Sequence, residues 1–188
     1  RKYRGEVLDL RDIPSAVGGD VNQRHGIILA KSMPAKAYGI RTGDSIWEAR
    51  QKYGPLTIVP PDYSLYDRSS HALLTLLREY SPDVEQYSID EAYVDMSGTQ
   101  KLFGSPEQAA DRIRERIREE LGFTVNIGIS ENKLLAKMAS DFRKPDRTHT
   151  LFAQEIPLKL WPLPVSELFF VGRASAKKLC NLGIYTIG

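Results

Sequence analysis

Two short apolar segments flank a turn sequence near the start of the chain. Residues 13–17 and 26–30 are typical of strands, and Gly18-Gly19-Asp20 between them is typical of a turn. The pattern therefore predicts a β-hairpin in the first part of the chain.

Two short helices are expected after this hairpin. Pro34 can occupy the first turn of a helix that ends at Gly39. Ser45 and Glu48 form an S-x-x-E capping signature, which opens a second helix to about Tyr53. Pro60-Pro61 then marks the end of a small module.

The longer pattern that follows changes between helical and strand spacing. Apolar residues first recur at helical intervals and then in strand-like runs, and a proline at a favourable first-turn position introduces another helix. The predicted elements are a helix around 72–80, strands at 84–89 and 92–96, a helix at 106–121, a strand at 123–129 and a helix at 132–142. This order is that of a ferredoxin-like βαββαβ sheet without its first strand, and it predicts an α+β fold.

Two adjacent carboxylates, Asp90 and Glu91, lie between the two middle strands. If those strands pair, they present both carboxylates at one edge. Such hard oxygen ligands suit Mg²⁺, which usually keeps waters and completes its shell with substrate phosphates. The pair therefore indicates chemistry on a nucleotide. The alternative is a plain hairpin turn, because acidic residues are common in turns.

Composition narrows the class of protein only a little. The chain has 26 Lys and Arg against 24 Asp and Glu, and its net charge of +2 means that a nucleic-acid partner needs local basic patches. Cys180 is the only cysteine, which excludes an intramolecular disulfide and favours a reducing, cytoplasmic setting. No apolar run reaches the roughly 18 residues of a membrane span and no signal-peptide pattern is visible, so we expect no membrane partner.

The segment Ser88-Ile89-Asp90-Glu91-Ala92-Tyr93-Val94-Asp95 resembles the palm active-site motif of Y-family DNA polymerases, the DinB/UmuC group that copies damaged templates. Other segments of that family follow in its order, at residues 24–31, 35–40, 60–63, 125–137 and 140–145. The resemblance runs from about Leu10 to the end of the chain. It implies a fingers module at 1–61, most of a palm at 62–151 and the start of a helical thumb at 152–188.

The resemblance also implies an activity and a cofactor. A DNA-directed DNA polymerase of this family transfers a nucleotide with two Mg²⁺ ions. Asp90 would bridge the two ions, and Glu91 would hold the ion near the primer end.

Five further positions match nucleotide contacts of the family. Lys36 matches its basic fingers residue and Lys144 its basic partner at the end of the palm, and both would meet the triphosphate. Met33 stands where the family often has a hydroxyl residue, with Ser32 beside it. Ile27 would lie over the nascent base pair. For each lysine the alternative is a solvated surface charge, which is the usual state of lysine.

The last part of the chain resembles a helix-hairpin-helix, whose backbone N–H groups contact a DNA phosphate without reading the sequence. Gly172, Arg173 and Lys177 are the implied DNA contacts. Phe170 replaces the usual first glycine of the hairpin, and its side chain would crowd a backbone that needs close approach. The alternative is a plain helical hairpin that packs on the palm.

The chain departs from the family pattern at its ends. The family opens with a strand that bears a further metal-binding Asp, followed by an aromatic pair that acts as a steric gate, and residues 1–7 contain no apolar run ending in Asp. The later thumb helices and the additional DNA-gripping domain are not visible either. We therefore expect weak DNA affinity and little primer extension from this chain alone.

The implied partners are primer–template DNA and a dNTP, and a sliding clamp would bind through regions outside this chain. Two other functions remain open. In a non-catalytic DNA-binding or scaffold protein, the acidic pair would be vestigial. A cyclic-dinucleotide synthase is suggested by Gly18-Gly19-Asp20, but that class has its signature on the active-site hairpin, and here the central hairpin carries Asp90 and Glu91.

Overall fold

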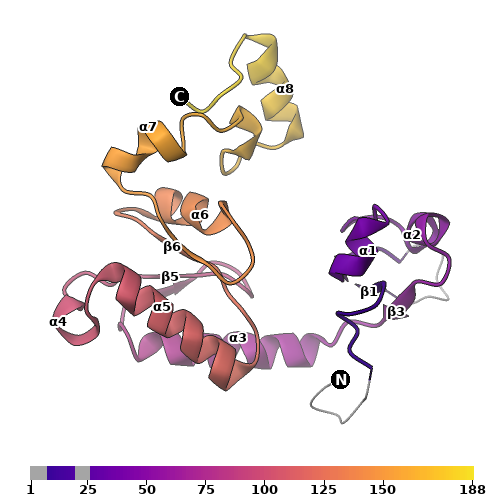
Figure 1. Cartoon of the computed structure of the whole chain (residues 1–188), viewed down its shortest axis with the longest axis horizontal. Helices are drawn as coiled ribbons and strands as arrows, with labels where there is room; N and C mark the ends of the chain where they lie inside the picture. The colour runs from indigo at the N-terminus through magenta and orange to yellow at the C-terminus, as the bar shows by residue number, and fades with distance from the viewer. Residues whose placement is uncertain (1–7, 20–25) are drawn as a thin grey trace. The chain divides into compact units, whose positions relative to one another are not determined.

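The computed structural model describes residues 8–19 and 26–188. The chain divides into two compact units, Arg1–Leu65 and Tyr66–Gly188, whose elements are labelled in Figure 1. Both contain helices and short strands, so the predicted α+β fold is confirmed. Asp20 of the predicted turn and residues 1–7 lie outside the described residues.

The N-terminal unit contains a three-stranded sheet in the order β2-β1-β3. Strand β1 (Ser15–Gly18) pairs antiparallel with β2 (Ile28–Lys31), which confirms the predicted hairpin. Strand β3 (Thr57–Val59) pairs in parallel with β1 and was not predicted. It is only three residues long, and Pro60-Pro61 directly after it obscured its pattern.

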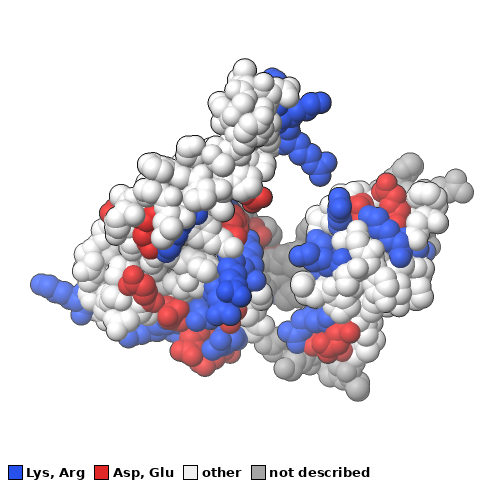
Figure 2. Space-filling view, turned by 45° about the horizontal axis from the view of Figure 1, so that its top comes forward, with Lys and Arg blue, Asp and Glu red and all other residues white. Residues whose placement is uncertain are grey.

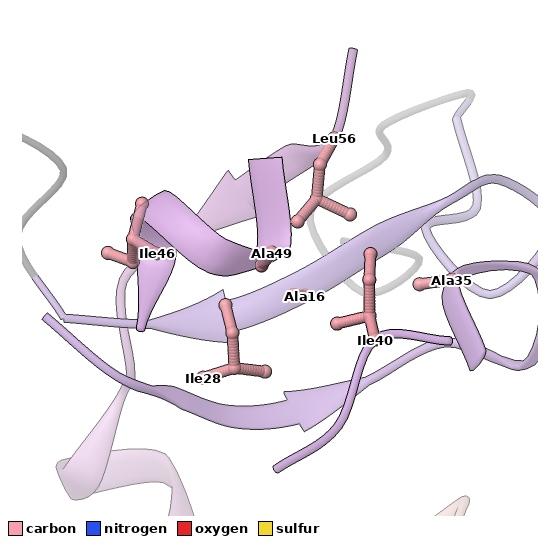
Figure 3. Packing of buried hydrophobic residues seen from close by; sticks show 7 residues of the cluster. All are labelled: Ala16, Ile28, Ala35, Ile40, Ile46, Ala49 and Leu56. Atoms are coloured by element: carbon pink, nitrogen blue, oxygen red, sulfur yellow. The ribbon is translucent and has the colours of Figure 1, made fainter. Parts of the chain in front are cut away.

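Helices α1 (Met33–Ala37) and α2 (Ile46–Lys52) cover the sheet of this unit. The capping box of Ser45 and Glu48 forms as predicted, and the Glu48 N–H donates to the Ser45 Oγ at 3.1 Å. Figure 3 shows how small and branched side chains from the strands, the helices and their connections close one core. The buried members are Ala16, Ile28, Ala35, Ile40, Ile46, Ala49 and Leu56.

The C-terminal unit begins with a helix and a hairpin. Helix α3 (Tyr63–Arg78) starts well before the predicted range. Strands β4 (Val84–Gln86) and β5 (Ala92–Val94) pair antiparallel, so the predicted strand pair around the acidic residues is confirmed. Helix α4 (Gln100–Phe103), which was not predicted, then leads toward the second long helix of this unit.

A second long helix and a β-α-β segment follow in the same unit. Helix α5 (Pro106–Arg116) continues as a π-helical turn to Leu121. Strand β6 (Ile127–Ile129) is shorter than predicted, and it pairs in parallel with β7 (Thr148–Thr150), which was not predicted. Helix α6 (Lys133–Asp141) connects the two strands, and Figure 1 shows β6 between α5 and α6.

One core joins these elements, although β4-β5 and β6-β7 are separate two-stranded sheets in the described part of the chain. Buried side chains of α3, α5 and the segments that follow them form its centre, and strand residues from both sheets pack against it. The central residues are Leu73, Leu76, Leu77, Tyr80, Ile113 and Ile117. The predicted order helix, strand, strand, helix, strand is confirmed.

The last part of the chain contains helices α7 (Ile156–Lys159) and α8 (Arg173–Asn181). A third buried cluster connects it to α6 through Met138, Ala139, Leu151 and Leu160. Among the described helices, none combines the length and the apolar character that a membrane crossing requires.

Candidate active site

Asp90 and Glu91 lie in the turn between β4 and β5. The backbone N–H groups of Tyr87 and Ser88 donate to the Glu91 carbonyl oxygen at 2.9 and 3.1 Å, which closes the turn. The Ser88 hydroxyl donates to Oδ1 of Asp90 at 2.7 Å. Asp90 is exposed and Glu91 is half-buried. The turn therefore leaves the Asp90 carboxylate open to solvent and keeps its backbone fixed.

A series of ion pairs connects Glu91 with α6 and the segment after it. Nζ of Lys137 lies 2.5 Å from Oε1 of Glu91 and 3.4 Å from Oδ2 of Asp141. Nζ of Lys144 lies 2.6 Å from Oδ1 of Asp141. We call these four residues the ionic chain. It links Glu91 and Lys144, two of the residues that the sequence proposes for the site.

The ionic chain favours the charged form of its inner members. Burial lowers the pKa of Lys137, but the hydrogen bond with Glu91 and the charge of Asp141 outweigh this effect and raise the pKa above its ordinary value. Burial raises the pKa of Asp141, but the hydrogen bond with Lys144 and the charge of Lys137 outweigh it and lower the pKa. Both groups are therefore ionised at neutral pH.

A second, separate ion pair connects the same helix with the same hairpin. Lys133, one helical turn before Lys137, pairs with Glu85 of β4. Its ammonium group also lies 5.6 Å from the ring centroid of Tyr93 on β5. The two lysines thus tie one face of α6 to the hairpin, but only Lys137 contacts a residue of the acidic pair.

The acidic pair offers oxygen ligands, which fit Mg²⁺, because this ion is usually held by one or two carboxylates together with substrate phosphates and water. Within residues 8–19 and 26–188, no group of three or more His, Cys, Asp or Glu side chains is placed to hold a metal ion. Asp90 and Glu91 would therefore share an ion with ligands from a substrate or solvent.

Three of the predicted nucleotide contacts are exposed in the N-terminal unit. Lys36 is exposed on α1, and no described carboxylate lies within ion-pair distance of it. Met33 is 72% exposed and Ile27 is 49% exposed. Their roles stay predictions, and the exposed surfaces leave each of them available to a ligand.

The fourth candidate in this unit, Ser32, is the N-cap of α1. Its hydroxyl donates to the Ile13 carbonyl at 2.7 Å, and it accepts from the N–H groups of Ser15 at 3.0 Å and Ala35 at 3.1 Å. Because a hydroxyl has one donor and two acceptor positions, these contacts use its whole capacity. A structural role is therefore the better interpretation of Ser32.

The predicted DNA contacts lie at the start of α8. Gly172 is the N-cap, and no described heavy atom would lie within 4 Å of a Cβ at that position. Arg173 and Lys177 are exposed. Figure 2 shows Lys and Arg side chains projecting from the end of the molecule that contains α8. Phe170 has φ of 70° and is 80% exposed. The hairpin thus keeps the left-handed backbone of a glycine while carrying an exposed ring.

The sequence interpretation missed Lys137 and Asp141 as parts of the site. Both lie in segments that carry the family resemblance, but no role was assigned to them. Their spacing on a helix was a usable signal, since residues three and four positions apart on a helix are neighbours. Asp141 pairs with Lys137 at i,i+4 and with Lys144 at i,i+3.

Comparison with known proteins identifies the family. Residues 4–141 match the model of the impB/mucB/samB family. The chain is 50% identical over 184 residues to DNA polymerase IV of Clostridium acetobutylicum, covering 98% of this chain and 46% of that protein. It is 44% identical over 179 residues to DNA polymerase IV 1 of Bacillus subtilis, covering 95% and 43%.

Solved structures agree with this result. DinB from Sulfolobus solfataricus matches with a TM-score of 0.81 at 28% identity, over 98% of this chain and 52% of that chain. The insertion ternary complex of Dbh DNA polymerase matches with a TM-score of 0.82 at 28% identity, over 98% and 53%. The chain spans about half the length of these relatives. The resemblance drawn from the motifs is confirmed: the chain belongs to the impB/mucB/samB family of Y-family polymerases.

Proposed function

We propose that this chain supplies the fingers, most of the palm and the start of the thumb of a lesion-bypass DNA polymerase, divided at 1–61, 62–151 and 152–188. The observation that carries the proposal is the β4-β5 turn, which holds the adjacent carboxylates Asp90 and Glu91 and connects Glu91 to Lys144 through the ionic chain. The polymerase names of the relatives support it.

In the proposed reaction, the primer 3′-hydroxyl attacks the α-phosphorus of a dNTP, and pyrophosphate leaves. Asp90 and Glu91 would hold two Mg²⁺ ions, which supply a lowered pKa of the attacking hydroxyl and charge neutralisation of the leaving group. Lys144 adds positive charge for the triphosphate, and to do so it exchanges its contact with Asp141 for one with phosphate. Lys36 is proposed as a second triphosphate contact on the resemblance alone.

The remaining contacts belong to the same proposal. The exposed side chain of Ile27 contacts the nascent base pair. Gly172, Arg173 and Lys177 contact the backbone of primer–template DNA, which holds the duplex without reading its sequence. Binding of a sliding clamp through other parts of the protein and a cytoplasmic location complete the proposal.

The first experiment measures Mn²⁺ binding to the 188-residue chain by electron paramagnetic resonance, for the wild type and for Asp90→Ala. Loss of one of two carboxylate ligands should weaken Mn²⁺ binding at least roughly tenfold, since charge-bearing contacts contribute about 1.5–3 kcal/mol. Glu85→Gln, a change of a carboxylate on the same hairpin but outside the acidic pair, serves as the control and should have a much smaller effect.

A non-catalytic scaffold is the second candidate, because the described residues place only two carboxylates together. Equal Mn²⁺ binding by the wild type and Asp90→Ala would favour that scaffold and count against the polymerase site. Primer extension by the chain alone is expected to be weak, and robust extension that Asp90→Ala abolishes would establish the catalytic role directly.

A further inference from the structure

Lys137 has the least exposed side chain of the ionic chain. It is 14% exposed, compared with 37% for Glu91, 45% for Asp141 and 60% for Lys144. Its ammonium group also lies 5.8 Å from the ring centroid of Phe169. Lys137 is thus held between a carboxylate on the hairpin and one on its own helix, in surroundings that screen its charge less than water does.

The contact with Glu91 conflicts with the proposed role of that carboxylate. An ammonium group 2.5 Å from Oε1 already neutralises Glu91. A divalent cation on the same carboxylate would be repelled by this nearby positive charge, because the separation is only a few ångströms. The ammonium group therefore has to move when a cation binds, and a second acceptor is within reach, since Oδ2 of Asp141 lies 3.4 Å from the same nitrogen.

We propose that Lys137 is a positioning residue. It forms an ion pair with Glu91 until a divalent cation binds, and its ammonium group then moves into an ion pair with Asp141. This inference rests on the proposed function, because it assumes that Glu91 binds a cation. In the absence of the cation, Lys137 keeps the acidic pair from repelling itself and holds Glu91 against α6. When the cation binds, Asp141 receives the displaced charge, so that the ammonium group keeps a partner.

The chain contains a matched control pair. Lys133 and Glu85 connect the same helix to the same hairpin, and in the described part of the chain neither forms an ion pair with Asp90 or Glu91. Removing either charge leaves the exchange between Glu91 and Asp141 intact. Because the side chains of Lys133 and Glu85 are 59% and 57% exposed, these variants control for the loss of one charge near the hairpin, and the direction of the change separates the exchange from that general effect.

The experiment compares Mn²⁺ dissociation constants of the 188-residue chain and its variants by electron paramagnetic resonance. Lys137→Met removes the competing charge, so we expect binding to become roughly tenfold tighter than in Lys133→Met. Asp141→Asn removes the second acceptor, so we expect binding about threefold weaker than in Glu85→Gln. Circular dichroism at each variant's assay temperature verifies that the chain is folded.

The opposite signs of the two changes separate this proposal from a merely structural role, which would weaken binding in both variants. If Lys137→Met binds Mn²⁺ no more tightly than Lys133→Met, the exchange is refuted. Glu91→Gln distinguishes this failure from failure of the proposed function. If Glu91→Gln weakens Mn²⁺ binding while Lys137→Met leaves it unchanged, only the exchange is refuted. If Glu91→Gln also leaves binding unchanged, the exchange and the proposed metal site at Glu91 are both refuted.

A measurement on the wild-type chain tests the exchange without depending on the folding of any variant. During a Mg²⁺ titration followed by NMR of the lysine side-chain NH₃⁺ groups, the signal of Lys137 should shift with the saturation of the site. The signal of Lys133 should shift much less, because its partner Glu85 is not a proposed ligand. Equal shifts of the two signals, or no shift of Lys137, would contradict the exchange.

Discussion

The two units hold their candidate nucleotide contacts in different ways. In the N-terminal unit, backbone capping fixes α1 through Ser32, while the side chain of Lys36 has no described carboxylate near it. In the C-terminal unit, Lys144 is paired with Asp141, and Lys137 connects Asp141 to Glu91. Under the proposed function, Lys36 offers a cation without a described carboxylate partner, whereas Lys144 has to leave its ion pair with Asp141 before it binds phosphate.

The largest expected effect concerns the packing that places the ionic chain. At Gly128 of β6, a Cβ would overlap the Ala136 carbonyl oxygen and lie 2.5 Å from the Ser140 backbone nitrogen. Because both neighbours are backbone atoms of α6, Gly128→Ala should move the helix and destabilise the C-terminal unit by about 3 kcal/mol. Urea unfolding followed by Trp161 fluorescence, in a Trp47→Phe background, measures the change.

Gly54→Ala in the N-terminal unit is the matched control. A Cβ at Gly54 would meet no heavy atom within 4 Å, and its φ is not in the left-handed region. Followed by Trp47 fluorescence in a Trp161→Phe background, the free energy of unfolding of the N-terminal unit should stay within about 1 kcal/mol of the wild type or rise slightly, since alanine restricts the unfolded chain. Equal destabilisation by Gly128→Ala and Gly54→Ala would mean that the close contact between β6 and α6 does not determine the stability of the C-terminal unit.

The difference between contacts that are local in the sequence and contacts that are distant in it explains what the sequence could predict. The capping box of Ser45 and the hairpin of Asp90 depend on residues close in the sequence, and both were predicted. Strands β3 and β7 are three residues each and depend on parallel partners far along the chain, so their local pattern was too weak. The contact of Lys137 with Glu91 spans 46 positions and follows from the packing of α6, which local patterns do not contain.

An effect of intermediate size is expected at Lys36 and Lys144, the two proposed triphosphate contacts. It is measured as binding of a fluorescent dNTP to the chain in the presence of Mg²⁺. Lys36→Gln should weaken binding about tenfold, since a hydrogen bond to a charged group contributes about 1.5–3 kcal/mol. Lys144→Gln should weaken it only about threefold, because Lys144 first has to leave Asp141, and an exposed pair of this kind offsets up to about 1 kcal/mol. A larger loss for Lys144→Gln than for Lys36→Gln would reverse the comparison.

The smallest effect is a dependence of stability on acid pH, which we follow at one carboxylate in each unit. The hydrogen bond with Lys52 lowers the pKa of Asp44 in the N-terminal unit, and the hydrogen bond with Arg114 lowers the pKa of Asp146 in the C-terminal unit. A carboxylate whose folded pKa is lowered contributes stability above its ordinary value, 3.8 for both groups, and this contribution is lost as the pH falls through the folded pKa.

Asp44→Asn and Asp146→Asn should therefore lower the urea midpoint at pH 7, and the difference from the wild type should shrink toward pH 3. We expect the larger change for Asp146→Asn, because Asp146 contacts the guanidinium groups of both Arg114 and Arg118, at 2.8 and 3.2 Å. Asp44 pairs with one cationic group, the ammonium group of Lys52, and accepts a hydrogen bond from the Arg41 backbone N–H at 2.7 Å. If the midpoint difference for Asp146→Asn is the same at pH 3 and pH 7, the ion pairs of Asp146 do not stabilise the C-terminal unit, and its stability would depend on packing alone, as it does at Gly128.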